Sequence, residues 1–434
     1  MFSVYTVCFF GHRQIDDFRI VEQRIERLID KLLNEHEYVE FLVGRDGEFD
    51  QLVTSAIRRC RKHLDTANCS VTWVMPYLKS DYIKNRKCYD FRREKEMSNN
   101  IYGIDLGTSN MKVYCKATGK ILNEKNTIAI INKNQMYAYG DAAYAMYEKA
   151  PEQIQVSFPI ICGVIADFNN MQTMIQEFLE KHAKGKTRGA EFIVAVPTDI
   201  TEVEKKAFFD IFYKSKMKPK SVLLCEKPLA DAVGLGLDVN EPTGAMIVDI
   251  GADTTEISVI SLGGLVLSDL LHFGGNRIDD SISSYIKKNF NLVIGRKTAK
   301  TLKEELGSGT PGMEKSMVIV GRDVVSGLPI EMEITAEVIY AAIKDNLNSI
   351  CNSIKMILEK TPPELAKDII HSGIYITGGG SKIHNLDKLF TEITNIKVNS
   401  CENPEECAVR GLNKIVSDEK YKHLGFSMKS KIYK

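Results

Sequence analysis

The stretch that decides the fold is AMIVDIGADTTEISVI, residues 245–260. Its apolar run ends at Asp249, a turn containing Gly251 follows, and apolar residues alternate again from Ile257. This order predicts a strand, a tight turn and a second strand. Backbone N–H groups of such a turn can face phosphate oxygens, and an acid at the end of a buried strand can hold Mg²⁺ or a water molecule. Taken alone, the pattern also fits an ordinary hairpin.

The same pattern occurs a second time, in IYGIDLGTSNMKVY at residues 101–114, where the acid is Asp105. Two such hairpins in one chain predict two similar half-domains that face each other across a cleft. A third element, GIYITGGGS at residues 373–381, is a strand that runs into three glycines. Glycines there let the backbone approach a ligand closely. Two acid-tipped hairpins followed along the chain by a turn of three glycines resemble the actin-like ATPase superfamily.

Length and composition narrow the class of protein. The chain has 434 residues, which predicts two or three domains, and 44% hydrophobic residues, which is enough for a folded core. The formal net charge of zero argues against nucleic acid as a partner. The ten cysteines form no C-x-x-C pair and are typical of a reduced, cytoplasmic protein. The sequence contains neither a signal-peptide pattern nor an apolar run of about eighteen residues, so we expect no transmembrane helix.

Residues 1–83 are predicted to form a separate α/β module. Strands are expected at 3–10, 38–43 and 69–75, with helices at 16–33 and 48–64 between them. Alternating strands and helices indicate a parallel, Rossmann-like sheet. The segments FGHR and FLVGRDGEFD resemble the YoqJ-like branch of the SLOG superfamily, and only the first half of that fold is covered. In this module His12 and Arg13 could bind an anion or simply end a strand in solvent. A highly charged linker, residues 84–98, follows.

From residue 99 onward the chain resembles MreB, the bacterial actin. The resemblance is carried by IDLGTSNMKVY (104–114), GVIADF (163–168), VAVPTDITEVEKKA (194–207), EPTGAMIVDIG (241–251), ISLGG (260–264), GRDVVSGLP (321–329) and ITGGGSKIHNLDKL (376–389). It implies an α/β, actin-like, two-lobed fold over residues 99–425. Each lobe would be a mixed-sheet subdomain, with small inserts near 128–158 and 276–330.

The resemblance also implies a site for ATP and Mg²⁺ between the lobes. Asp105 and Asp249 would hold the metal, and the catalytic candidates are Asp249 and Glu226. The nucleotide-binding positions would be Asp105, Gly107, Thr108, Ser109, Asn110, Gly251, Ala252, Asp253, Thr254, Lys300, Lys303, Gly378, Gly379, Gly380 and Ser381.

Several of these positions depart from the family pattern. Lys227 stands where the family has the glutamate that orients the hydrolytic water, and Ala252 and Asp253 stand in a turn that is all glycine in the family. Lys300 replaces the acid of an E-x-x-K pair that contacts the ribose. These changes predict at most a slow ATPase. Lys227 could also pair with Asp253 or with a phosphate, which would preserve nucleotide binding.

The function that the resemblance implies is an ATP-binding, filament-forming protein that organises cell-wall synthesis and rod shape. A regulatory paralogue with impaired hydrolysis, which caps or joins filaments of a complete MreB, is an alternative, and a small-molecule kinase of the same superfamily is a weaker one. Expected partners are further copies of the chain, MreB paralogues and the cell-wall elongation machinery. The loop KHAKGKTR, residues 181–188, could contact anionic lipid at the inner face of the cell membrane or lie in solvent.

Overall fold

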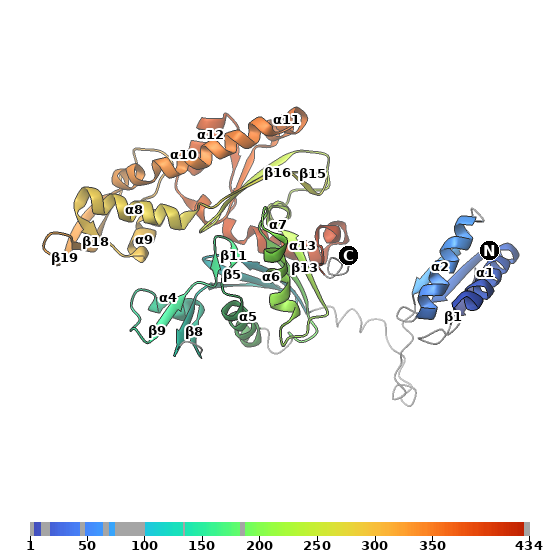
Figure 1. Ribbon diagram of the computed structural model, residues 1–434. Helices are drawn as coiled ribbons and strands as arrows, with labels where there is room; N and C mark the ends of the chain where they lie inside the picture. Colours follow the sequence, from blue (N-terminus) through green and yellow to red (C-terminus); the bar gives the residue numbers. More distant parts are fainter. Residues whose placement is uncertain are drawn as a thin grey trace. The chain divides into compact units, whose positions relative to one another are not determined.

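The computed structural model describes residues 4–9, 18–43, 48–63, 69–73, 100–132, 135–182 and 187–428. The chain divides into two compact units, Met1–Phe91 and Arg92–Lys434, which are drawn in Figure 1 and described separately below. His12, Arg13, the expected linker at 84–98 and residues 183–186 of the basic loop lie outside the described residues.

The first unit contains a parallel sheet. Its strands are β1 (Val4–Phe9), β2 (Tyr38–Val43) and β3 (Cys69–Trp73), and β2 pairs with both of the others. Helices α1 (Phe18–Glu35) and α2 (Glu48–His63) connect them. Alternate residues of β2 are buried among apolar side chains of both helices, which gives this small unit a core of its own. The resemblance to the SLOG superfamily stays a prediction.

The second unit contains two large mixed sheets with the same topology. In the first sheet the order is β13 (Ser221–Glu226), β12 (Glu191–Val196), β4 (Ile101–Leu106), β5 (Asn110–Cys115) and β6 (Lys120–Lys125). In the second sheet the order is β21 (Val398–Asn399), β20 (Ile374–Thr377), β14 (Ala245–Ile250), β15 (Thr255–Ser261) and β16 (Gly264–Leu271).

The directions of the strands match as well as their order. In each sheet the first three strands along the chain form an antiparallel meander, and two later strands add in parallel beside the first. The predicted duplication of an acid-tipped hairpin is therefore confirmed at the level of whole sheets.

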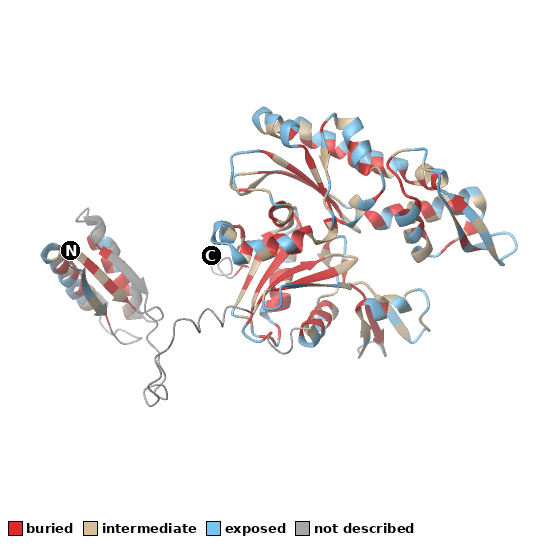
Figure 2. Ribbon diagram, turned by 180° about the vertical axis from the view of Figure 1, so that it is seen from behind, coloured by how far each residue is buried: buried red, intermediate tan, exposed pale blue. Residues whose placement is uncertain are grey.

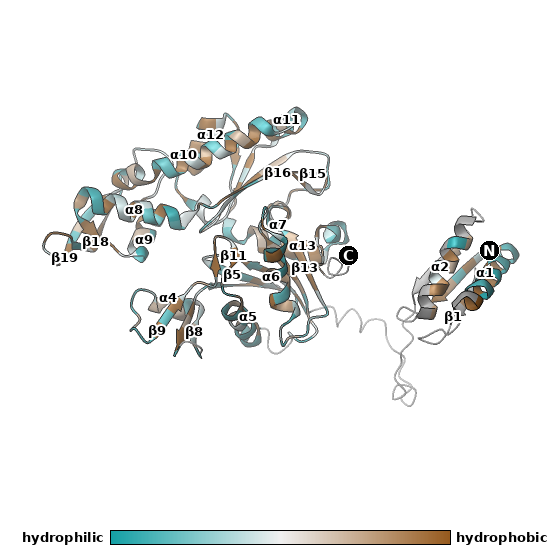
Figure 3. Cartoon of the chain, in the orientation of Figure 1, coloured by the Kyte–Doolittle hydropathy of each residue, from teal (hydrophilic) through white to brown (hydrophobic). Residues whose placement is uncertain are grey.

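Helices cover the outer faces of both sheets (Figure 1). The lobe built on the first sheet carries α5 (Phe168–His182) and α6 (Glu202–Tyr213). The lobe built on the second sheet carries α8 (Gly275–Phe290), α9 (Arg296–Leu306), α10 (Ala336–Lys360), α11 (Pro363–Ser372) and α12 (Leu386–Thr394). Figure 3 shows hydrophilic and hydrophobic residues sharing α10, which is the pattern of a helix that buries one face.

Small elements extend from each lobe. Near the first lobe lie β7 (Ile128–Ile131), β8 (Gln135–Tyr139), α4 (Gly140–Met146) and β9 (Ile154–Ser157), followed by the short strands β10 (Ile160–Ile161) and β11 (Val164–Ile165). Near the second lobe lies a sheet of β17 (Leu292–Val293), β18 (Ser316–Asp323) and β19 (Pro329–Thr335). The predicted subdomain boundaries stay predictions. No helix among the described residues is long and apolar enough to cross a membrane.

Two helices lie between the large sheets and join the lobes. These are α7 (Lys227–Leu235) and α13 (Cys407–Ser417), whose apolar residues form one buried cluster with residues of both sheets. Glycines permit their close crossing, because a Cβ added at Gly411 would lie 1.7 Å from the carbonyl oxygen of Ala230. Figure 2 shows the buried residues concentrated in the sheets and the helix faces that contact them. The packing fixes the first turn of α7, and with it Lys227, next to the ends of β4 and β14.

Candidate functional site

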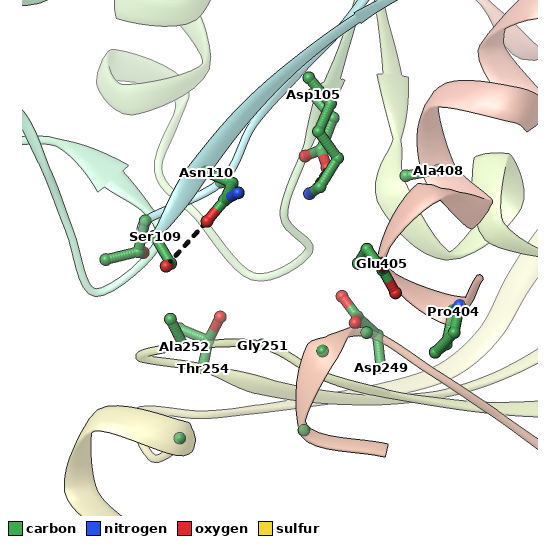
Figure 4. Close-up of a pocket in the computed structure, with 18 of the residues that line it drawn as sticks. Asp105, Ser109, Asn110, Asp249, Gly251, Ala252, Thr254, Pro404, Glu405 and Ala408 are labelled. Carbon is green, nitrogen blue, oxygen red and sulfur yellow. Dashed lines mark hydrogen bonds and ion pairs between the residues drawn. The ribbon is translucent and has the colours of Figure 1, made fainter. Parts of the chain in front are cut away.

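A cavity of about 470 Å³ lies where the two lobes meet. Its walls include the turn after β4, the turn after β14 and the turn after β20. Figure 4 shows Ser109 and Asn110 of the first turn on one side of the cavity, with Gly251, Ala252 and Thr254 of the second turn opposite them. The three glycine-containing turns that the sequence predicted are thus brought together at one place.

Side chains from the neighbouring strand hold the first turn, which contains Gly107–Asn110. The amide nitrogen of Asn110 donates to Asn123 at 2.7 Å, and the ammonium of Lys125 donates to the Asn110 side-chain oxygen at 2.9 Å. Asn126 donates to the carbonyl of Gly107 at 2.8 Å. Because these contacts come from β6 and the residue that follows it, the turn is shaped before any ligand arrives.

The second turn is closed by its own backbone and by Asp253. The N–H of Gly251 donates to the carbonyl of Thr254 at 2.8 Å. Asp253 accepts one hydrogen bond from the backbone N–H of Cys162 at 2.9 Å and another from the side chain of Asn276 at 2.7 Å. The Asp253 carboxylate therefore ties the turn to a loop of the first lobe and to α8, and it does not line the cavity.

The third turn depends on glycine for a steric reason. Gly378 has φ +81°, and a Cβ built there would lie 2.1 Å from the Oδ1 atom of Asp249. By contrast, a Cβ at Gly379 would meet no atom within 4 Å. The turn continues into the 3₁₀ helix η2 (Gly379–Lys382), where the Ser381 hydroxyl donates to the carbonyl of Gly378 at 2.7 Å. Ser381 therefore stabilises the turn without lining the cavity.

Two ion pairs occupy the cavity floor. The ammonium of Lys227 lies 2.5 Å from Asp249, and the ammonium of Lys112 lies 2.8 Å from Asp105. The four side chains are largely buried, with exposed fractions of 18% and 6% in the first pair and 10% and 5% in the second. Asp249 at the end of β14 thus binds the first residue of α7, and Asp105 binds the residue directly opposite it on β5.

The charges in these pairs raise or lower the pKa values of their members. Burial opposes the charged form of Lys227, but the carboxylates of Asp249 and Asp105 outweigh it and raise the pKa of the lysine well above its ordinary value. For Asp105, burial again opposes ionisation, and the ammonium groups of Lys112 and Lys227 lower its pKa below the ordinary value. Lys227 and Asp105 are therefore charged at neutral pH.

Two further acids are buried beside these pairs. Asp231, one turn after Lys227 on α7, has a pKa raised well above its ordinary value, first by burial and then by Asp249. Burial likewise raises the pKa of Glu256 to about 7. Glu256 accepts a hydrogen bond from the backbone N–H of Thr198 at 2.6 Å and another from the Thr198 hydroxyl. Because β15 carries Glu256 and the loop after β12 carries Thr198, this contact joins the two lobes.

The lysines at the ribose positions are arranged differently from one another. Lys303 is buried and donates to Asp279 at 2.7 Å and to the carbonyl of Gly275 at 2.8 Å, so it fastens α9 to α8. Lys300 lies 3.9 Å from Glu304, and both line the cavity. Residue 300 is a lysine where the family has an acid, but Glu304 places a carboxylate at the same wall of the cavity.

Most of the sequence-predicted residues line the cavity. These are Asp105, Gly107, Thr108, Ser109, Asn110, Asp249, Gly251, Ala252, Thr254, Lys300, Lys303, Gly378, Gly379 and Gly380. Glu226, Asp253 and Ser381 do not. Glu226 ends β13 and precedes α7, whereas its neighbour Lys227 reaches the cavity. The sequence interpretation had allowed a contact of Lys227 with Asp253, but Lys227 contacts Asp249.

Three buried charged residues of the cavity were not among the predicted site residues: Lys112, Asp231 and Glu256. Each had a signal. Lys112 is a charge inside an otherwise apolar strand, and Asp231 follows Lys227 by one helical turn. Glu256 is the one charged residue in the predicted strand TEISVIS, residues 255–261.

The residues present do not fit a divalent cation bound directly by the two predicted carboxylates. One oxygen of each carboxylate is already bound by a lysine ammonium, so a metal ion there would lie beside two positive charges. Among the described residues, no group of three or more His, Cys, Asp or Glu side chains could hold a metal ion, so the protein alone does not form a complete set of ligands. Mg²⁺ prefers oxygen ligands in near-octahedral geometry, and the pairing with lysine removes part of that set.

Comparison with known proteins agrees with this architecture. The chain matches the family described as MreB/Mbl protein over residues 99–423. It is 38% identical over 312 residues to the cell shape-determining protein Mbl of Bacillus cereus, covering 71% of this chain and 93% of that protein. It is 37% identical over 328 residues to the cell shape-determining protein MreB of Escherichia coli, covering 74% and 94%.

A solved structure adds the fold. The crystal structure of MreB 5 of Spiroplasma citri bound to AMPPNP is similar with a TM-score of 0.71 and 34% identity, covering 75% of this chain and 97% of that one. The second unit therefore has the two-lobed, actin-like fold, and the chain belongs to the MreB/Mbl family.

Proposed function

We propose that the actin-like unit of this chain binds ATP in the cavity between its lobes, assembles into filaments and helps to determine cell shape by organising cell-wall synthesis. The observation that carries this proposal is the convergence of the three glycine-containing turns on one cavity, in a member of the MreB/Mbl family. The similar S. citri protein holds AMPPNP, which supports a nucleotide as the ligand.

The cavity offers a nucleotide both close backbone approach and positive charge. The turns after β4, β14 and β20 contain glycines, so their backbones can approach phosphate oxygens without a side chain between them. Lys112, Lys125, Lys227 and Lys382 also line the cavity. Lys125 is held close to Lys300, and burial together with this neighbour lowers its pKa to about 8. An arriving phosphate would relieve that repulsion.

Filament assembly is the second part of the proposal. We expect head-to-tail contacts between copies of the chain, because such contacts repeat without closing. MreB paralogues and the cell-wall elongation machinery are the further partners that the family relationship favours. We place the protein in the cytoplasm, with contact at the inner membrane face as an option that the basic residues near 181–188 leave open. The formal net charge of zero gives no reason to propose nucleic acid.

Sedimentation and negative-stain microscopy test the proposal. The full chain should pellet above a critical concentration when ATP is present, and the pellet should contain filaments. The same assay with ADP and without nucleotide shows whether ATP favours assembly. A chain that stays monomeric at every concentration, alone and mixed with a MreB paralogue, would contradict the filament function.

A regulatory paralogue with impaired hydrolysis is a second candidate, and Lys227 favours it. An ammonium cannot accept a hydrogen bond from water, so it cannot replace the acid that orients an attacking water molecule. Its ion pair also occupies Asp249, which is one of the two catalytic candidates. Asp253 is held outside the cavity by Cys162 and Asn276, so it does not have to be replaced together with Lys227. The single variant Lys227→Glu is therefore the informative one.

Phosphate release under saturating ATP and Mg²⁺ distinguishes the two candidates. If positioning of water is the main loss, Lys227→Glu should raise turnover by about tenfold or more. Equal turnover in the natural chain and the variant would mean that another acid performs this task. A small-molecule kinase is not favoured, because the family match extends over residues 99–423, well beyond the cavity.

A further inference from the structure

We propose that Lys112 and Lys227 supply the positive charge that a divalent cation would otherwise provide, so that this chain holds the phosphates of a nucleoside di- or triphosphate without Mg²⁺. The inference rests on the proposed nucleotide binding and specifies its ionic requirement. It starts from the disagreement between the implied metal and the residues on the cavity floor.

The first step is geometric. Asp105 and Asp249 are the acids at the ends of the two duplicated hairpins, one from each lobe, and each binds a lysine within 2.8 Å. Both lysines line the same cavity as the glycine turns. In particular, the ammonium of Lys112 lies 3.7 Å from the position of a Cβ on Gly107, directly behind the first turn. The two positive charges therefore lie at the base of the phosphate-binding turns.

The second step is a comparison of charge. Two carboxylates with one divalent cation have no net charge, and two carboxylates with two ammonium groups have none either. A bound triphosphate would therefore meet the same net charge at the cavity floor with two lysines as with one divalent cation. An ammonium also donates up to three hydrogen bonds, so a lysine that binds a carboxylate still has donors for a phosphate oxygen.

The third step concerns competition. A Mg²⁺ ion near Asp105 and Asp249 would have to displace both ammonium groups or lie next to them. Displacement is hindered because Lys227 and Lys112 are only 18% and 10% exposed. An unpaired ammonium in such surroundings is costly, and a dication beside it is repelled more strongly than in water. The lysines and the metal are therefore alternatives at this floor.

The remaining charged groups of the floor do not change this balance. Asp231 and Glu256 are the other buried acids there, and burial favours the neutral form of each. At neutral pH Asp231 therefore adds little negative charge, and Glu256, whose pKa is about 7, is only partly ionised. Asp253, the acid of the second turn, is held outside the cavity by its two hydrogen bonds.

The test is calorimetric titration of ATP and of ADP into the full chain, with Mg²⁺ and with EDTA in its place. The dissociation constants in the two buffers should agree within about threefold. Binding that weakens by more than about threefold in EDTA would overturn the inference while leaving the proposed function intact. Failure to bind in either buffer, with a normal thermal unfolding transition, would refute nucleotide binding itself and the inference with it.

Variants connect the result to the two lysines. Methionine keeps the apolar length of lysine and removes its charge, so Lys112→Met with Lys227→Met leaves Asp105 and Asp249 available to a metal. This double variant should lose binding in EDTA by at least about tenfold and recover it with Mg²⁺. The matched control is Lys382→Met, which removes a lysine of the same cavity that pairs with Glu405 instead. It should show no new difference between the two buffers.

If the double variant does not fold, the comparison of the two buffers on the natural chain still decides the question. If the control becomes dependent on Mg²⁺ to the same extent as the double variant, general loss of positive charge explains the effect and the assignment to Lys112 and Lys227 is wrong.

Discussion

Removing the charge of Lys227 should destabilise the actin-like unit strongly, and Lys227→Met is the variant that shows it. In the natural chain its ammonium lies 2.5 Å from Asp249, and Asp105 and Asp231 also contribute to its raised pKa. Without the ammonium, Asp249 keeps a charge that is 6% exposed and has lost its partner. Leaving one member of a buried pair alone costs about 3–5 kcal/mol. We expect the lower end, about 3 kcal/mol, because Lys227 keeps some contact with solvent.

A double-mutant cycle separates the pair from the loss of packing. The cycle consists of Lys227→Met, Asp249→Asn and the two together, measured as free energies of unfolding in urea. The double variant removes both charges, so it should be more stable than Lys227→Met alone. The matched control is Lys220→Met, whose pair with Glu191 has exposed fractions of 71% and 33% and should contribute less than about 1 kcal/mol.

Two results would refute this reasoning. If Lys227→Met costs no more than Lys220→Met, the buried pair on the cavity floor contributes no more to stability than an exposed pair does. If the effects of the two single variants simply add in the double variant, Lys227 and Asp249 do not interact in solution, and the metal-free site loses its physical basis.

Two further predictions concern the cavity walls. Burial raises the pKa of Glu256 from 4.5 to about 7, so its contribution to stability is fully present below pH 4.5 and is lost as the pH rises through 7. Urea unfolding across this pH range should show the free energy of unfolding of the natural chain falling by about 3 kcal/mol relative to that of Glu256→Gln, whose side chain never ionises. The same pH dependence in both proteins would contradict this. Gly378→Ala should cost at least about 1–3 kcal/mol, because its Cβ would meet Asp249 at 2.1 Å and its φ is +81°, whereas Gly379→Ala has free space and should change the melting temperature little. Equal effects of the two alanines would show that the third turn can rearrange.

The sequence predicted the duplicated hairpins because their signal is local. An apolar run, an acid and a glycine turn specify a strand and its end without knowledge of the rest of the chain. The internal repeat then supplied the two-lobed architecture, and the turns it predicted do line one cavity. Local pattern could not say which way Asp253 points. Its carboxylate turns away because the N–H of Cys162 and the amide of Asn276, both distant in sequence, offer hydrogen bonds there.

The partners of the two acids were harder to predict for a similar reason. Lys227 was recognised as a departure from the family pattern, but its contact with Asp249 requires the first turn of α7 to lie against the end of β14. That placement comes from the packing of α7 on α13 between the sheets. Lys112 needs only the register of one hairpin, in which it lies opposite Asp105. A stricter use of strand pairing could therefore have found the second ion pair from the sequence alone.

The pattern of departures indicates a rebuilt site rather than a decayed one. A site that loses its function accumulates charges without partners, because nothing selects for their pairing, and such charges are costly when buried. Here Lys227 has Asp249 and Lys112 has Asp105, while the carboxylate of Asp253 accepts two hydrogen bonds. The charges of Lys227 and Asp253, which differ from the family pattern, are thus matched by a group of opposite charge or by hydrogen-bond donors. This matching of charges supports the proposed binding of a nucleotide over an empty remnant, and it agrees with the proposal that the phosphates are held without a metal ion.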